Sequence, residues 1–123
     1  MSNRTPASRP WRLIAALLGL SGVALAAVAA HAIADPKAAQ AVERAALMQL
    51  VHALLLLYAT SLSGPFPRLA RWFTLTGVTL FCGGIYTKYL LGILAAGTVA
   101  PVGGIALMLG WLMLGLSSLT KDN

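Results

Sequence analysis

Four long apolar runs, separated by short breaks, constrain the fold of this 123-residue chain more than any other feature. The runs cover residues 13–33, 45–62, 72–94 and 102–119. A helix needs about 20 apolar residues to cross the hydrocarbon layer of a membrane, and each run is close to that length. Backbone groups in lipid must be satisfied within the segment, which favours helices over open strands. The sequence therefore predicts an all-α fold, an integral membrane four-helix antiparallel bundle.

The composition excludes the soluble alternatives. Hydrophobic residues make up 59% of the chain and charged residues only 10%, whereas a soluble domain carries about 25% charged residues. Three acidic and nine basic residues are too few to cover the large relative surface of a small soluble domain. The single cysteine, Cys82, cannot close an intrachain disulfide. A soluble enzyme, a disordered tail and a disulfide scaffold are therefore excluded.

The breaks between the runs set the predicted helix boundaries. Asp35 followed by Pro36 combines a preferred N-cap residue with a proline at the first helical position, so the second helix should begin at Pro36. Short loops then place consecutive helices antiparallel. We predict a basic N-terminal segment over 1–12, one transmembrane domain over 13–119 and a tail over 120–123. The helices of that domain are expected at about 13–33, 36–62, 69–94 and 101–119.

The charged residues predict how the chain sits in the membrane. The net charge is +6, and the basic residues flank the apolar runs rather than form a dense stripe. This distribution favours a lipid bilayer as the partner and excludes nucleic acid. One side would hold Arg4, Arg9, Arg12, Arg68, Arg71 and Lys121, and the other side Lys37 and Arg44 with Asp35 and Glu43. By the positive-inside rule both termini should be cytoplasmic.

The first run has a second interpretation. Basic residues precede it, and Ala30-His31-Ala32 is similar to the cleavage site of a secretory signal peptide. The run is longer than the roughly 7–15 apolar residues of such peptides, so we expect a retained helix.

Small residues at close spacing predict where the helices touch. Helices in lipid associate through close packing, which glycine and alanine permit. The alternative is that these residues only reflect an alanine-rich composition. We expect tight interhelical contacts at Gly22, Ala26, Gly83, Gly84, Gly103, Gly104 and Gly110.

Polar side chains within the apolar runs are candidate functional residues, because they are costly in lipid. The candidates for a polar site are His52, Gln49, His31, Lys88 and Tyr86. On a helical wheel, Gln49 and His52 share one side of the second helix, which should face the bundle. The leucines at 47, 50, 54 and 57 share the opposite side, which should face lipid.

Two interpretations of Gln49 and His52 stay open. In the first, they form interhelical hydrogen bonds that fix the register of the bundle. The partners would be Thr76, Thr79, Tyr86 or a backbone carbonyl. In the second, they line a polar pocket for a quinone headgroup, a small solute or a proton.

Trp111 falls in the middle of its predicted helix, away from the membrane interfaces that tryptophan prefers, and so needs a packing partner.

The sequence predicts no metal site. At about 1.5 Å per residue, His31 and His52 differ in depth by about 13 Å, whereas two nitrogens that flank one metal at ~2 Å bonds lie about 4 Å apart. A haem held by His52 alone stays open, although nothing else supports it.

Lys88 is expected either to extend to the outer interface or to act as a counter-ion for a bound anion or Glu43. Without a nucleophile–base pair or a phosphate-binding loop, we expect neither an enzyme nor a cofactor.

Several motifs point to one family. They are Ala30-His31, Met48-Gln49-x-x-His52-Ala53-Leu54, Phe81-Cys82-Gly83-Gly84-x-Tyr86, Pro101-x-Gly103-Gly104 and Gly110-Trp111. In their order and spacing they resemble the transmembrane protein 256 family, also called domain of unknown function 423, over about residues 13–119. This chain departs from the family pattern in having alanines before His31, Met48 at a position that is often aromatic, and Cys82 and Gly84 at positions of serine. Any polar pocket that those serines line would be more apolar here.

The resemblance implies a small four-helix membrane protein of bacterial inner membranes and of mitochondria, with no established activity. Given the small size and the absence of reaction chemistry, we expect a non-catalytic accessory or structural subunit of a larger membrane complex, for example a respiratory one. Its partners would be other membrane subunits or further copies of the chain. The alternative is a membrane protein that binds a quinone-like ligand or translocates a solute, with its pocket at Gln49 and His52.

Overall fold

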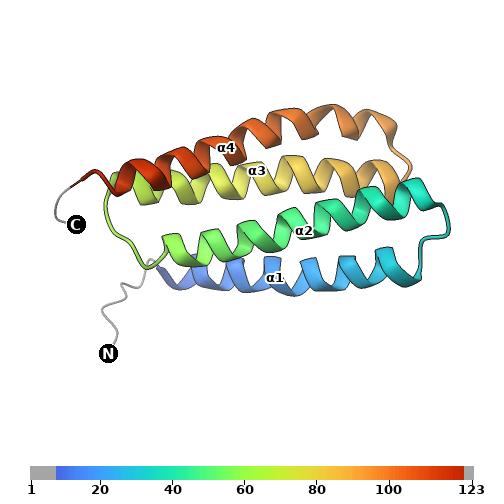
Figure 1. The fold of residues 1–123 in the computed structure, drawn as a ribbon, viewed down its shortest axis with the longest axis horizontal. Helices are drawn as coiled ribbons and strands as arrows, with labels where there is room; N and C mark the ends of the chain where they lie inside the picture. Colours follow the sequence, from blue (N-terminus) through green and yellow to red (C-terminus); the bar gives the residue numbers. More distant parts are fainter. Residues whose placement is uncertain (1–7, 121–123) are drawn as a thin grey trace.

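A computed structural model describes residues 8–120 and shows that this part of the chain is helical throughout, apart from short connections. The elements are α1 (Ser8–His31), α2 (Pro36–Ala59), α3 (Pro65–Leu90), the 3-10 helix η1 (Leu94–Val99) and α4 (Ala100–Ser117). Each long helix packs against the next one in the chain and runs in the opposite direction (Figure 1). The start of α1 and the end of α4 therefore lie at the same end of the molecule. The predicted all-α four-helix antiparallel bundle is confirmed.

The structure refines the expected helix boundaries. α1 begins at Ser8, so Arg9 and Arg12 belong to the helix rather than to a separate basic segment. α3 covers 65–90 rather than 69–94, because a proline occupies its first turn and Gly92, with a φ of 75°, follows its C-terminus in the left-handed conformation. Residues 94–99, expected as a helix end and a loop, form η1. Arg4, Lys121 and the predicted tail beyond residue 120 lie outside the described residues.

The predicted start of α2 is confirmed. Asp35 is the N-cap residue, and its carboxylate accepts a hydrogen bond of 3.1 Å from the backbone N–H of Ala38. Pro36 occupies the first turn, where its missing N–H costs nothing. This arrangement fixes the point at which the chain turns back from α1.

Three helical segments of the described chain are long and apolar enough to cross a membrane. They are α1, α2 and the continuous segment Leu94–Ser117, which joins η1 to α4. α3 has 26 residues and is at least as long, but it is less apolar because Arg68 and Arg71 lie near its start and Lys88 near its end. Its neighbours are α2 and α4, beside which it lies along its length (Figure 1).

Glycines allow the closest approaches between helices. A Cβ added at Gly103 on α4 would overlap the backbone of Phe81 on α3, and one at Gly110 would lie 2.7 Å from the Thr74 Oγ1. At Gly84 it would lie 2.8 Å from the carbonyl oxygen of Ala96 in η1. At Gly22 on α1 it would lie 2.9 Å from the side chain of Leu50 on α2. These glycines therefore permit the close packing on which helix association in lipid depends.

The close approach expected at three other small residues is not seen. A Cβ at Gly83 would meet nothing within 4 Å, and one at Gly104 would make an ordinary contact of 3.7 Å with the Phe81 ring. Ala26 is only half-buried, and Ala29 is the buried alanine of that turn. Successive helical residues are about 100° apart, so two adjacent glycines point in different directions and do not both face the same neighbouring helix.

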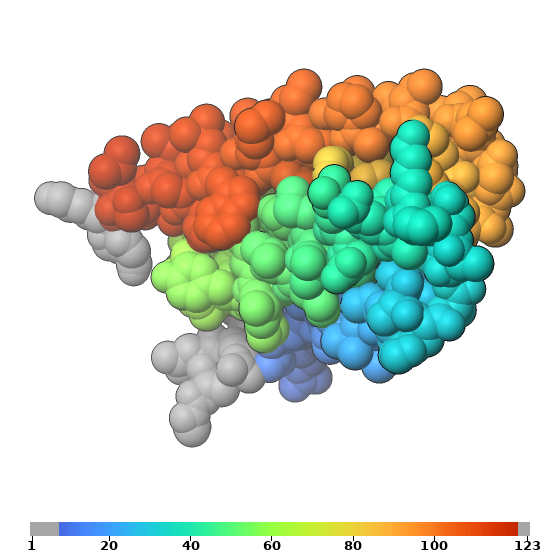
Figure 2. All heavy atoms as spheres, turned by 45° about the vertical axis from the view of Figure 1, so that its right-hand side comes forward, coloured from blue at the N-terminus to red at the C-terminus, as the bar shows by residue number. Residues whose placement is uncertain are grey.

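The predicted orientation of α2 is confirmed for most of its residues. Gln49 and His52 are each 3% exposed, whereas Leu47, Leu54 and Leu57 are exposed. Leu50, expected to face lipid, is half-buried because it packs against Gly22. On the face shown in Figure 2, side chains of α2 lie between those of α1 and those of α4. α2 therefore presents its polar side to the interior of the bundle.

Candidate functional site

The side chain of Gln49 joins three helices. Its Nε2 donates hydrogen bonds to the Ser21 Oγ at 2.7 Å and to the Leu18 carbonyl oxygen at 2.8 Å, both on α1. Its Oε1 accepts a hydrogen bond of 2.8 Å from the Tyr86 hydroxyl on α3. The amide orientation follows from chemistry, since a backbone carbonyl can only accept and must therefore face the NH₂ group. Both amide hydrogens and the amide oxygen thus have partners.

His52 links α2 to α4. Its Nε2 lies 3.1 Å from the Trp111 Nε1, and its Nδ1 lies 2.7 Å from the Met48 carbonyl oxygen. An indole N–H can only donate, so Nε2 must accept, whereas a carbonyl can only accept, so Nδ1 must carry the proton. Both contacts therefore require the same neutral tautomer. Neither ring nitrogen keeps a free lone pair for a metal or a haem iron.

Together, Ser21, Gln49, His52, Tyr86 and Trp111 form what we term the polar network. Through it, α2 is hydrogen-bonded to each of the other three long helices. The bond from Trp111 also supplies the packing partner that its mid-helix position required. Every bond of the polar network involves Gln49 or His52, and both of these side chains are buried, which limits competition from water.

The structure brings together three of the five candidate residues. Gln49, His52 and Tyr86 belong to the polar network, but His31 is exposed at the end of α1 and Lys88 lies near the end of α3. The Lys88 Nζ is 5.1 Å from the centre of the Tyr89 ring, a cation–π distance. Among residues 8–120, no group of three or more His, Cys, Asp or Glu side chains is placed to hold a metal ion.

The sequence did not predict Ser21 and Trp111 as hydrogen-bond partners of Gln49 and His52. Ser21 is the partner on α1, whereas Thr79, one of the expected partners, donates to the Leu75 carbonyl oxygen within its own helix. The signal for Ser21 was its position, a polar residue next to a packing glycine inside an apolar run. The signal for Trp111 was its depth in the predicted helix.

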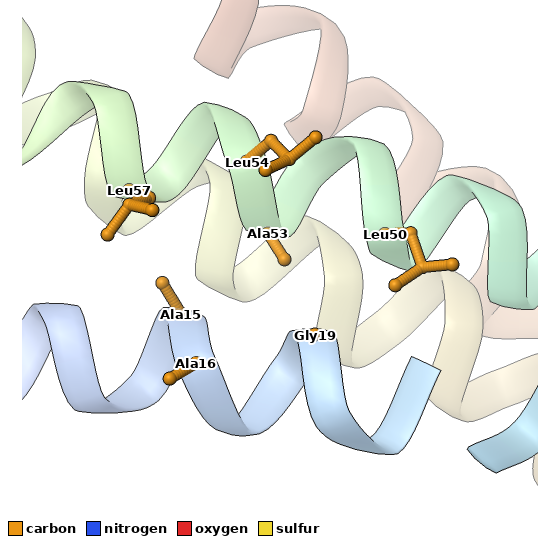
Figure 3. Close-up of a pocket in the computed structure, with 7 residues that line it drawn as sticks. All are labelled: Ala15, Ala16, Gly19, Leu50, Ala53, Leu54 and Leu57. Carbon is orange, nitrogen blue, oxygen red and sulfur yellow. The ribbon is translucent and has the colours of Figure 1, made fainter. Parts of the chain in front are cut away.

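An apolar groove lies between α1 and α2 (Figure 3). Its volume is about 290 Å³. It is lined by Ala15, Ala16, Gly19, Leu50, Ala53, Leu54 and Leu57. Small residues provide most of its α1 wall and leucines most of its α2 wall, so it offers shape but no polar group to a partner.

Long apolar helices in an antiparallel bundle, linked by hydrogen bonds between polar side chains, define a small multi-pass helical membrane protein. The family model described as "Protein of unknown function (DUF423)" matches residues 25–104. The chain belongs to this family, and the resemblance noted in the sequence is thereby confirmed.

Relatives of the same kind occur in staphylococci. A UPF0382 membrane protein of Staphylococcus epidermidis is 29% identical over 113 residues, which cover 87% of this chain and 93% of the relative. One of Staphylococcus saprophyticus is 30% identical over 108 residues, with coverage of 83% and 90%. One of Staphylococcus aureus is 35% identical over 75 residues, and the match spans 62% of its length. No solved structure matches the chain.

Proposed function

We propose that the protein is a non-catalytic accessory or structural subunit of a larger membrane complex, without a cofactor of its own. The observation that supports this proposal is the saturation of the polar network. Gln49 uses both ends of its amide, and His52 uses both ring nitrogens, in bonds between or within helices. These residues therefore stabilise the bundle. An interior whose polar side chains serve only to hold the helices together is expected of a structural subunit.

The alternative, a quinone or solute site at Gln49 and His52, has less support. A ligand there would have to displace the Tyr86 hydroxyl or the Trp111 indole, and both residues are held on other helices. In lipid no water replaces the lost partner, so each donor left unpaired costs about 1–3 kcal/mol. The ligand would have to offset that cost before it gained any affinity.

The apolar groove supports assembly with a partner helix. Helices in lipid associate where small residues let side chains of one helix enter the surface of another. The α1 wall of the groove supplies Ala15, Ala16 and Gly19, and a Cβ added at Gly19 would meet nothing within 4 Å. The partner would be a transmembrane helix of another subunit or of a second copy of the chain.

Filling the apolar groove tests this role. In Gly19→Leu the added side chain enters open space in the isolated subunit, so the bundle should still fold. The leucine would fill the apolar groove and block the partner helix from binding there. After extraction in mild detergents or native nanodiscs, native mass spectrometry should show about fivefold less partner bound to the variant, a loss of roughly 1 kcal/mol. Gly115→Leu, which also points into open space but on α4, should retain the partner. Recovery of the unaltered protein only as a lone monomer, in several detergents, would refute the subunit role.

We further propose that all four long helices cross a bacterial inner membrane and that both termini are cytoplasmic. The common end of α1 and α4 supports this topology, as do Arg9, Arg68 and Arg71 at that end. α3 contributes its basic residues only near its ends, where they can reach the interfaces.

Cysteine accessibility tests the topology. In a Cys82→Ala background, Ala34→Cys places a thiol in the α1–α2 turn and Ser63→Cys places one in the α2–α3 turn. In right-side-out membrane vesicles an impermeant maleimide should label position 34 and spare position 63, and permeabilisation should expose both. Labelling of both positions in sealed vesicles, or of position 63 alone, would overturn the proposed topology.

A further inference from the structure

Two cationic side chains share a groove at the end of the bundle away from the start of α1. This cationic groove has a volume of about 290 Å³ and lies between α2, α3 and η1. Arg44 and Lys88 contribute its positive charge, and Tyr89 lies beside them. Its floor is apolar and consists of Met48, Phe81 and Ile85. Figure 2 brings this end of the molecule, with the start of α2 and with η1, toward the viewer.

The two cations have no carboxylate partner within the part of the chain that the structure describes. Among residues 8–120, only Asp35 and Glu43 are acidic, and neither forms an ion pair with Arg44 or Lys88. Asp35 is engaged instead as the cap of α2. Two like charges that line one groove repel each other, and an anion between them would offset that repulsion.

Lys88 is held in place by its neighbours. A Cβ at Gly97 in η1 would lie 2.8 Å from the Lys88 Cδ. The aliphatic part of the lysine side chain therefore packs against η1 at a glycine, where there is room for it. The Nζ then lies over the Tyr89 ring at 5.1 Å. A cation held in one position gives up less conformational freedom when it binds an anion than a free surface lysine does.

The groove lies at the border between the charged start of α2 and its apolar part, which begins at Ala45. Lys88 is two residues before the end of α3, and Arg44 is eight residues after the start of α2, about 12 Å along the helix axis. Cations at the ends of membrane helices extend toward the phosphate layer. Phosphates of the headgroup layer carry the opposite charge and attract such side chains.

From this geometry we infer that the cationic groove binds an anionic phospholipid. The phosphate accepts hydrogen bonds from Arg44 and Lys88, and the first part of an acyl chain lies along Met48, Phe81 and Ile85. Charged hydrogen bonds to phosphate are stronger than neutral ones, and the apolar floor excludes a purely hydrophilic anion as the preferred ligand. The inference requires only a membrane-embedded bundle and is independent of any partner subunit.

The test compares lipids on the full-length protein. Native mass spectrometry of the protein in dodecyl maltoside, titrated with phosphatidylglycerol or phosphatidylcholine, should show about tenfold tighter binding of the anionic lipid. Arg44→Gln with Lys88→Gln should abolish this preference and leave the binding of phosphatidylcholine unchanged. Arg9→Gln with Arg68→Gln removes the same charge at the other end and should preserve the preference. Arg44→Lys and Lys88→Arg should retain most of it.

Each remaining outcome counts against the inference. Equal binding of the two lipids by the unaltered protein overturns it, as does an equal loss in the control pair. If inorganic phosphate alone protects the protein from thermal unfolding as well as phosphatidylglycerol does, the ligand is a soluble anion and the lipid assignment is wrong. If the double variant does not fold, the charge-conserving variants decide: loss of the preference in both of them refutes a site that depends on charge.

Discussion

Gly103→Ala is expected to lower the free energy of unfolding by about 2–3 kcal/mol, the upper part of the range for an overpacked core. A Cβ at this position would overlap the backbone of Phe81 on α3. Backbone atoms cannot move aside as a flexible side chain can, so α3 and α4 would have to separate. Every close contact along the two helices would then weaken. Reversible unfolding in mixed micelles of a mild and a denaturing detergent measures the change.

Gly104→Ala is the matched control for Gly103→Ala. Its Cβ would make an ordinary contact of 3.7 Å with the Phe81 ring. Alanine is favoured over glycine in a helix interior by up to about 1 kcal/mol, so this neighbour should be neutral or slightly stabilising. Equal effects of the two substitutions would show that α3 and α4 do not approach each other as described.

The contrast between adjacent glycines also shows how far the sequence alone predicts the packing. Motif spacing identified Gly83 with Gly84, and Gly103 with Gly104, as candidates for helix contact. The sequence did not distinguish between the members of a pair, because the rotation of each helix about its axis depends on its neighbours. In the structure Gly84 and Gly103 make the close approaches. Only the assembled bundle selects one residue from each pair.

Local chemistry explains what the sequence did predict. The side chain of Asp35 and the fixed φ of Pro36 define the start of α2 within one turn of helix. The contrast between polar and leucine residues then determined which side of α2 faces inward. The bond between His52 and Trp111 joins residues 59 apart in the sequence. This bond depends on the axial register of α4 against α2, which no local sequence pattern determines. The 3-10 helix η1 connects α3 to α4 and likewise depends on how these two helices pack.

Gln49→Leu is expected to destabilise the bundle by about 2 kcal/mol. Interhelical hydrogen bonds in membranes contribute about 0.6 kcal/mol on average and up to about 1.7 kcal/mol each. The substitution removes the bonds to Ser21, Leu18 and Tyr86 together. Leucine is apolar and occupies a similar space, so the loss reflects hydrogen bonding more than a cavity. The same detergent unfolding measurement applies.

A double-mutant cycle separates a structural role of the polar network from a ligand site. Tyr86→Phe removes one of the hydrogen bonds of Gln49, and Ser21→Ala removes another. Each should cost about 0.6–1 kcal/mol. Combined with Gln49→Leu, each should add little, because the partner is already gone. Fully additive effects would mean that these residues do not interact. Unchanged stability in Gln49→Leu, together with lost binding of a quinone analogue, would instead assign the polar network to a ligand and refute its role in holding the helices together.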